Sequence, residues 1–213
     1  VVTYAGTGTS PSTIGHGLGV APKLIITKNR DAAYNWITYS SEIGSSQVLA
    51  LDATLAAFTP SGGNYGSVTS STYQVVQGSD FTNLNRSGDD YVAYCFAPVA
   101  GYSAMGSYVG NGSSDGVFVY TGFRSRWVLL KQSSASGEAW FLLDTARSPY
   151  NVSQEYLVPN ASFGETSAYN IMDILSNGFK LRATGSVSSF NGSGATYIYY
   201  AVAENPFQSS RAR

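Results

Sequence analysis

The sequence contains a single cysteine, Cys95, and a single histidine, His16, among its 213 residues. One cysteine excludes an internal disulfide framework and any metal site built from several thiolates. One histidine excludes zinc centres that use two or three histidines. Oxygen atoms would therefore have to bind any metal ion, which leaves Ca²⁺ or Mg²⁺ in a loop as the remaining option.

Charge is also scarce, because only 12% of the residues are charged, against roughly 25% in an average protein. Lys and Arg number 12 and Asp and Glu number 13, so the chain has no bulk positive field and we expect no nucleic-acid partner. No run of about 18 apolar residues occurs, so we expect no membrane insertion. The apolar share of 43% is ample for a packed core and argues against disorder.

What the sequence does contain is an internal repeat. Two halves align at a spacing of about 105 residues, the size of a small β-sandwich. The matched segments are Tyr4–Gly8 with Tyr108–Gly112, Lys23–Lys28 with Arg126–Lys131, Trp36 with Trp140, and Asn85–Gly88 with Asn191–Gly194. We therefore expect a duplication with domains at 1–102 and 103–213. On superposition, Gly6 should pair with Gly110 and Gly88 with Gly194.

Each half is predicted to be built of β-strands, because aromatic and β-branched runs alternate with turns rich in Gly, Ser and Asn. The expected strands are Lys23–Lys28, Tyr73–Val76, Tyr91–Phe96, Arg126–Lys131, Phe179–Arg182 and Tyr197–Val202. Gln47–Phe58 and Tyr169–Leu175 fit a helical turn, a strand or a loop. The expected fold is all-β, with two tandem and similar β-sandwich or jelly-roll-like units.

Trp36 and Trp140 occupy matched positions and allow two interpretations. They are either a platform on which sugar rings stack or core residues that each half needs. The core is favoured, because the positions repeat within a strand and tryptophan is highly buried on average. Trp127 aligns with Leu24 and is expected in the core as well. Cys95 lies in an apolar run and is expected to be a buried, unreactive thiol.

Asn-x-Ser-Gly occurs at Asn85 and Asn191, before the last expected strand of each half. This pattern predicts a tight turn in which Asn bonds its own backbone and Gly supplies a positive φ. The same two residues belong to a set of Asn-x-Ser sequons, whose glycosylation would require a eukaryotic secretory route. The sequons are Asn85, Asn111, Asn151, Asn160 and Asn191.

Several acidic residues lie in loops rich in Gly and Ser. Asp89, Asp90 and Asp115 allow calcium binding, but one or two carboxylates are weak evidence because Ca²⁺ needs 6–8 oxygens. Solvated turn residues are the favoured interpretation. Asp144 and Arg147 are expected to form an ion pair that fixes the turn before Pro149.

No catalytic arrangement can be assembled from the sequence. A Ser-His-Asp triad would need His16, which has no acid beside it, and the chain has no GxSxG motif. Hydrolysis by a carboxylate pair stays open, because the sequence does not show distances in space. We expect no enzyme activity, no catalytic residue, no metal and no cofactor.

Five segments together carry a family resemblance: Gly15–Ile26, Tyr91–Tyr102, Phe118–Arg124, Phe179–Arg182 and Ala203–Phe207. The chain resembles a family of virion-associated, tail-fibre-like proteins of tailed phages, common in marine phages, with a duplicated β domain. The resemblance covers nearly the whole chain. It departs at Ser125, where the family usually has a proline that matches Pro22. The family has no agreed catalytic residues, so the resemblance assigns no site.

The resemblance implies a structural protein on the virion surface, in the tail fibre or on the capsid exterior. A receptor-binding module would contact a glycan or a protein of the host cell. A capsid or tail decoration protein is the alternative, and a glycan depolymerase has the least support. The expected partners are other virion proteins and further copies of the chain. The sequence does not identify the ligand site, the host or the oligomeric state.

Overall fold

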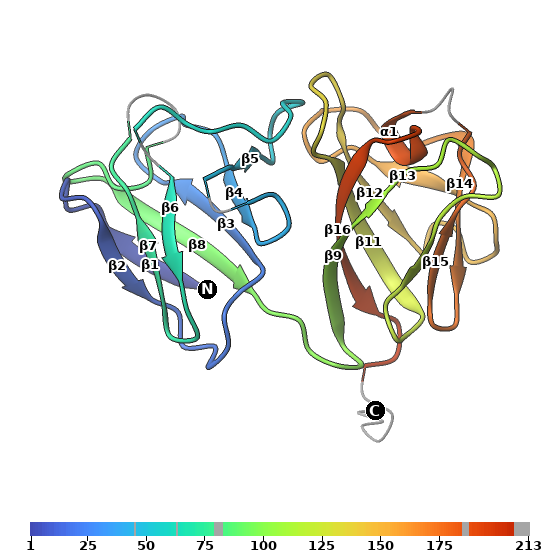
Figure 1. The fold of residues 1–213 in the computed structure, drawn as a ribbon, viewed down its shortest axis with the longest axis horizontal. Coiled ribbons are helices and arrows are strands. Elements are labelled where there is room, and N and C mark those ends of the chain that lie inside the picture. Colours follow the sequence, from blue (N-terminus) through green and yellow to red (C-terminus); the bar gives the residue numbers. More distant parts are fainter. Residues whose placement is uncertain (45, 63, 79–82, 185–187, 207–213) are drawn as a thin grey trace. The chain divides into compact units, whose positions relative to one another are not determined.

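The computed structural model describes residues 1–206 apart from 45, 63, 79–82 and 185–187. The regular secondary structure of these residues is almost entirely β-strand, which confirms the predicted all-β class (Figure 1). The chain divides into two compact units, Val1–Ala97 (unit 1) and Pro98–Arg213 (unit 2).

The boundary between the units lies a few residues before the position expected from the sequence, which was after residue 102. Val99 forms a bridge with Ser103, and the backbone carbonyl of Tyr102 accepts a hydrogen bond of 2.8 Å from the N–H of Ala203. Residues 98–102 therefore belong to unit 2.

Unit 1 is built from two antiparallel sheets. Its strands are β1 (Val2–Ala5), β2 (Ser12–Gly15), β3 (Leu24–Asn29), β4 (Ile37–Ser40), β5 (Leu49–Ala50), β6 (Tyr65–Val68), β7 (Thr72–Val75) and β8 (Asp90–Phe96). The larger sheet has the order β1-β8-β3-β4-β5, and the smaller sheet has the order β2-β7-β6.

Unit 2 is built from one antiparallel sheet. Its strands are β9 (Ser103–Val109), β10 (Phe118–Tyr120), β11 (Ser125–Gln132), β12 (Trp140–Asp144), β13 (Ser153–Leu157), β14 (Thr166–Leu175), β15 (Gly178–Leu181) and β16 (Thr196–Ala203), and a short helix α1 (Ser188–Asn191) precedes β16. The sheet has the order β10-β15-β14-β13-β12-β11-β16-β9.

The two units share one strand order. Starting from its edge strand β9, the sheet of unit 2 has the order β9-β16-β11-β12-β13, which matches β1-β8-β3-β4-β5 in unit 1. It continues with β14-β15-β10, which matches β6-β7-β2 in unit 1. The units differ in one strand pairing: β13 pairs with β14 in unit 2, whereas the corresponding strands β5 and β6 of unit 1 belong to separate sheets. Unit 2 is thus a continuous sheet rather than a sandwich of two separate sheets. A common strand order is what a duplication requires, and the duplication itself stays a prediction.

The core of each unit lies on one face of its strands, because side chains alternate across a strand. In unit 1 the buried cluster is Ile25, Ile37, Val48, Tyr65, Tyr73, Val75, Leu84 and Ala93. In unit 2 a larger cluster includes Val119, Val128, Leu130, Phe141, Leu143, Ile174, Phe179 and Tyr197. The neighbours of these residues along each strand point to the opposite face, where some of them, such as Thr38 and Trp140, are buried as well.

All six strands expected from the sequence are present, with shifts of one residue at their ends. The two segments for which a helical turn, a strand or a loop was considered contain strand and loop and no helix. Within Gln47–Phe58, Val48 and Phe58 form an antiparallel bridge and the short β5 follows Val48. Tyr169–Leu175 lies in β14, which pairs with β15. The helix α1 was not anticipated.

Lys131, the expected last residue of its strand, is buried. The β11 strand continues past it to Gln132, and the Lys131 side chain has 0% exposure. Its Nζ donates a hydrogen bond of 2.5 Å to the backbone carbonyl of Glu138. Burial lowers the pKa of Lys131 from 10.5 to about 8, because loss of water disfavours the charged ammonium.

From the lowered pKa of Lys131 we predict that the stability of the folded protein rises with pH. Between about pH 8 and 9.5 the unfolded chain holds a proton on Lys131 that the folded chain has released, so the free energy of unfolding should increase across that range. The Lys131→Met variant should lack this component. Urea unfolding of both proteins at several pH values measures the difference, and parallel pH profiles would contradict the prediction.

Candidate binding surface

Each unit carries the same clasp between its first and last strands. The rings of Tyr4 and Tyr91 stack with centroids 4.9 Å apart, and those of Tyr108 and Tyr197 stack at 4.8 Å. The four hydroxyl groups bind backbone atoms just before the last strand. These bonds are Tyr4 Oη to Leu84 O, Arg86 N to Tyr91 Oη, Tyr108 Oη to Phe190 O and Gly192 N to Tyr197 Oη. The clasp is architecture that both units need.

Asn85 and Asn191 complete the clasp, and both have 0% exposure. The Asn191 amide donates to the carbonyls of Ser113 at 2.8 Å and Ala183 at 3.1 Å, and its Oδ1 accepts from Asn111 N at 3.1 Å. Asn85 Oδ1 likewise accepts from Thr7 N at 2.9 Å.

The prediction that each asparagine bonds its own backbone is therefore wrong, because both side chains reach the loop that follows the first strand. The predicted positive φ of Gly88 and Gly194 is confirmed, at 85° and 76°. Burial also means that the sequons at Asn85 and Asn191 are closed to a glycan in the folded chain.

The tryptophans lie on the sheet face opposite the core clusters. Phe141 faces the core of unit 2, so Trp140, the residue before it, faces away, although only 1% of it is exposed. Trp36 is half-buried and stacks on Tyr94, with ring centroids 6.3 Å apart. The expected burial of Trp140 is confirmed, whereas Trp36 is less buried than expected. Trp127 is likewise half-buried on β11, packed edge-on against an aromatic ring.

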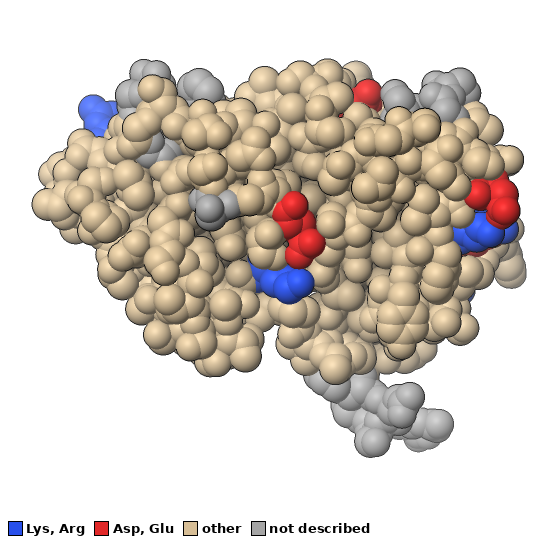
Figure 2. All heavy atoms as spheres, viewed as in Figure 1, with Lys and Arg blue, Asp and Glu red and all other residues tan. Residues whose placement is uncertain are grey.

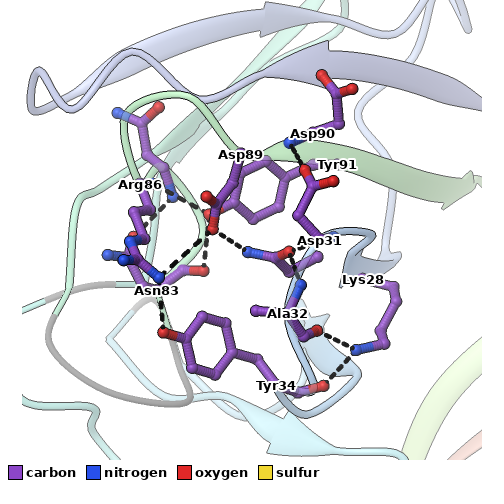
Figure 3. Close-up of polar contacts among 11 residues, drawn as sticks. Lys28, Asp31, Ala32, Tyr34, Asn83, Arg86, Asp89, Asp90 and Tyr91 are labelled. Carbon is purple, nitrogen blue, oxygen red and sulfur yellow. Dashed lines mark hydrogen bonds and ion pairs between the residues drawn. The ribbon is translucent and has the colours of Figure 1, made fainter.

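Asp89 and Asp90 belong to a polar network in unit 1, shown in Figure 3. The Asp89 carboxylate accepts a hydrogen bond of 2.7 Å from Asn29 Nδ2 and faces Arg86 Nη1 at 3.9 Å. The N–H of Asp90 donates to the carboxylate of Asp31. Across the described part of the chain, no group of three or more His, Cys, Asp or Glu side chains could hold a metal ion.

The rest of this network also binds the protein to itself. Lys28 Nζ donates to the carbonyls of Ala32 at 3.1 Å and Tyr34 at 2.5 Å, and Arg86 Nη1 donates to Tyr34 Oη at 3.2 Å (Figure 3). The Lys28 bonds hold the β3–β4 loop to β3, and the Arg86 bond joins this loop to the segment before β8. The cluster therefore fixes loops and offers little that is free for a ligand.

The predicted ion pair between Asp144 and Arg147 is confirmed by direct contact of the two side chains. Arg147 Nε also lies 2.9 Å from a carboxylate oxygen of Glu165. The pair therefore ties the β12–β13 loop to the β13–β14 loop. This second partner was not visible in the sequence.

The two residues considered for nucleophilic chemistry have other contacts. His16 Nε2 lies 3.1 Å from the carbonyl of Thr69, and Nδ1 accepts from Leu18 N at 3.2 Å, so both ring nitrogens contact backbone. Cys95 is only partly buried, in contrast to the expectation of full burial, and it packs against the core of unit 1. Burial raises the pKa of its thiol to about 11, which keeps it protonated and unreactive at neutral pH.

A set of exposed aromatic side chains in unit 2 was missed by the sequence interpretation. Its members are Phe118 (44% exposed), Tyr120 (67%), Tyr150 (84%), Phe163 (71%) and Tyr169 (48%). Tyr102, at 39%, lies near the unit boundary. Among the described residues of unit 1, no Phe, Tyr or Trp reaches this level of exposure. Large aromatic side chains are enriched among the residues that dominate the binding energy of protein interfaces.

Two of these rings lie on β10. Val119 faces the core, so Phe118 and Tyr120 point outward on either side of it. Tyr120 lies opposite Gly178 of β15, and a Cβ on Gly178 would be 3.1 Å from the Phe118 ring. Because Gly178 has no side chain, the Phe118 ring can lie close against the backbone of β15.

Two further rings lie in loops that are held in place. Asn151, next to Tyr150, exchanges hydrogen bonds with the backbone of Ile174, at 2.9 Å and 3.2 Å. Phe163 lies two residues before Glu165, which is bound by Arg147. These contacts fix the backbone near both rings, so each ring is displayed from an ordered loop.

Figure 2 shows only scattered Lys, Arg, Asp and Glu on the face that it presents. In the described residues, no helix is long and apolar enough to cross a membrane. No curated protein and no solved structure matches the chain. One family model matches residues 1–206 and so spans both units. The chain therefore belongs to the family described as "Domain of unknown function (DUF7483)".

Proposed function

We propose that this chain is a surface-attachment module of a tailed-phage virion, in which unit 2 contacts the host cell. The proposal includes binding without catalysis and without a cofactor. It takes the virion surface from the resemblance to tail-fibre-like proteins. It takes the contacting unit from the exposed aromatic side chains.

Among the described residues, the restriction of exposed aromatics to unit 2 is the observation that supports this proposal best. Both units have the same strand order, so the fold does not require these rings. Aromatic side chains are rigid and large, and they dominate the energetics of many interfaces. A feature that stability does not need, and that water disfavours, is best explained by a binding partner.

Several copies of the chain on one virion would strengthen its attachment to the host cell. Weak contacts by single rings become effective when several copies bind at once, because avidity adds roughly 10²–10⁴-fold. We therefore also propose that the chain acts as a homo-oligomer, assembled with other virion proteins.

The test is competition for adsorption. Host cells incubated with the purified full chain should adsorb fewer virions that carry this protein, and the polysaccharide of those cells should keep its length. Antibody against the chain should label the distal end of the tail. Labelling spread over the capsid, with no competition, would contradict attachment and support the decoration alternative. Shortened polysaccharide would indicate a depolymerase.

A further inference from the structure

We propose that the outer face of β10 and β15 is a binding site for a neutral polysaccharide. We call this face the β10 strip and define it by Phe118, Tyr120, Lys180, Arg182, Asp115 and Asp173. The inference rests on the proposed function and names the ligand class of the attachment module.

The strip has a fixed backbone. Phe118 pairs with Lys180 and Tyr120 pairs with Gly178 in the β10–β15 ladder. Beyond the ladder, the N–H groups of Thr121 and Gly122 both donate to the carbonyl of Asn177, at 3.0 Å and 3.1 Å. The two rings are therefore held two residues apart on one strand, about 7 Å along its axis.

The charges of the strip balance. Lys180 Nζ contacts Asp115 Oδ1, and Arg182 Nη2 lies 2.6 Å from Asp173 Oδ2. The hydrogen bond from Lys180 lowers the pKa of Asp115, which stays ionised at neutral pH. With two cations and two carboxylates, the face attracts neither a polyanion nor a polycation.

These groups fit a carbohydrate without charge. The apolar faces of pyranose rings pack on aromatic rings, and sugar hydroxyls both donate and accept hydrogen bonds. Lys180 and Arg182 supply donors beside the rings, and Asp115, which is 82% exposed, supplies an acceptor. A peptide or a lipid would not form hydrogen bonds with all three of these polar side chains.

Unit 1 shows what the same face looks like without this site. The core-facing Val119 and Phe179 are paired in β10–β15, as Ile14 and Tyr73 are in β2–β7. Phe118 and Tyr120 then stand where unit 1 has Thr13 and Gly15, and Lys180 stands where it has Gln74. Thr13 of unit 1 therefore supplies the replacement residue for a variant of the strip.

The experiment uses the full chain on an array of immobilised neutral and anionic polysaccharides. The wild type should bind neutral glycans, and the double variant Phe118→Thr with Tyr120→Thr should bind them at least about tenfold more weakly. The control variant Thr13→Ala, on the equivalent strand of unit 1, should bind like the wild type. Thermal unfolding should be nearly the same for all three, since the replaced side chains are exposed.

Three results would overturn the inference. The first is equal binding by the double variant, and the second is binding confined to anionic glycans. The third is binding to host cells that survives periodate oxidation of their glycans but is lost in the double variant, because the strip would then contact a protein. If the double variant still competes for adsorption, the β10 strip is not the binding site, but the proposed attachment function is kept. If the wild type fails to compete, attachment itself fails.

Discussion

Gly110→Ala is expected to destabilise unit 2 by about 3 kcal/mol or more. A Cβ at this position would lie 2.3 Å from the backbone carbonyl oxygen of Gly192, which is too close for any rotamer to relieve. The end of β9 would have to move. Its movement would strain the bonds from Gly110 N to Ala195 O and from Gly194 N to Gly110 O, both 2.9 Å long. Native-state hydrogen exchange of β9 and β16 amides measures the loss.

The chain offers a repeat and a control for this substitution. Gly6→Ala should affect unit 1 in the same way, because its Cβ would lie 2.0 Å from the carbonyl oxygen of Arg86. Gly164→Ala should change stability by no more than about 0.5 kcal/mol, since nothing lies within 4 Å of the added atom. Equal protection in Gly110→Ala and Gly164→Ala would show that the clasp tolerates a side chain.

Asn191→Ala is expected to cost roughly 4 kcal/mol, because it removes three hydrogen bonds made by a fully buried side chain. The carbonyls of Ser113 and Ala183 and the N–H of Asn111 would each lose a hydrogen bond to a side chain that is fully buried. Urea unfolding, followed by the fluorescence of the tryptophans in unit 2, provides the measurement.

Asn170→Ala is the matched control, since Asn170 is exposed and its amide oxygen accepts from Gln154 at the surface. It should change the free energy of unfolding by less than about 0.5 kcal/mol. A small effect of Asn191→Ala would mean that water replaces the lost bonds, and the clasp would then not be a main source of stability.

The strands could be predicted where apolar runs are bounded by turns, as for β3 and β8. Side-chain direction was harder to predict, because neighbouring residues in several strands are all apolar. Trp140 and Phe141 stand side by side on β12, and either could have faced the core. Lys131 was taken for a strand end because a pattern does not show how a lysine can bury its chain while its ammonium binds a backbone carbonyl.

The same ambiguity hid the candidate site. Phe118, Val119 and Tyr120 are three apolar residues in a row, so their sequence gives no indication that the middle one is buried and the outer two are exposed. Only pairing with β15 resolves this, because Phe179 must face the core opposite Val119. The ties from Arg147 and Asn151 likewise join residues distant in sequence. Such contacts follow from the fold and not from local pattern.

In both units the strand that is synthesised last lies inside the sheet. β8 is inserted between β1 and β3, and β16 between β9 and β11. Pairings such as Val2 with Ala93 and Val109 with Thr196 join residues from opposite ends of a unit. Contacts between such distant residues slow folding. A ribosome must therefore deliver almost the whole of a unit before its sheet can be completed, and unit 1 can finish while unit 2 is still being made.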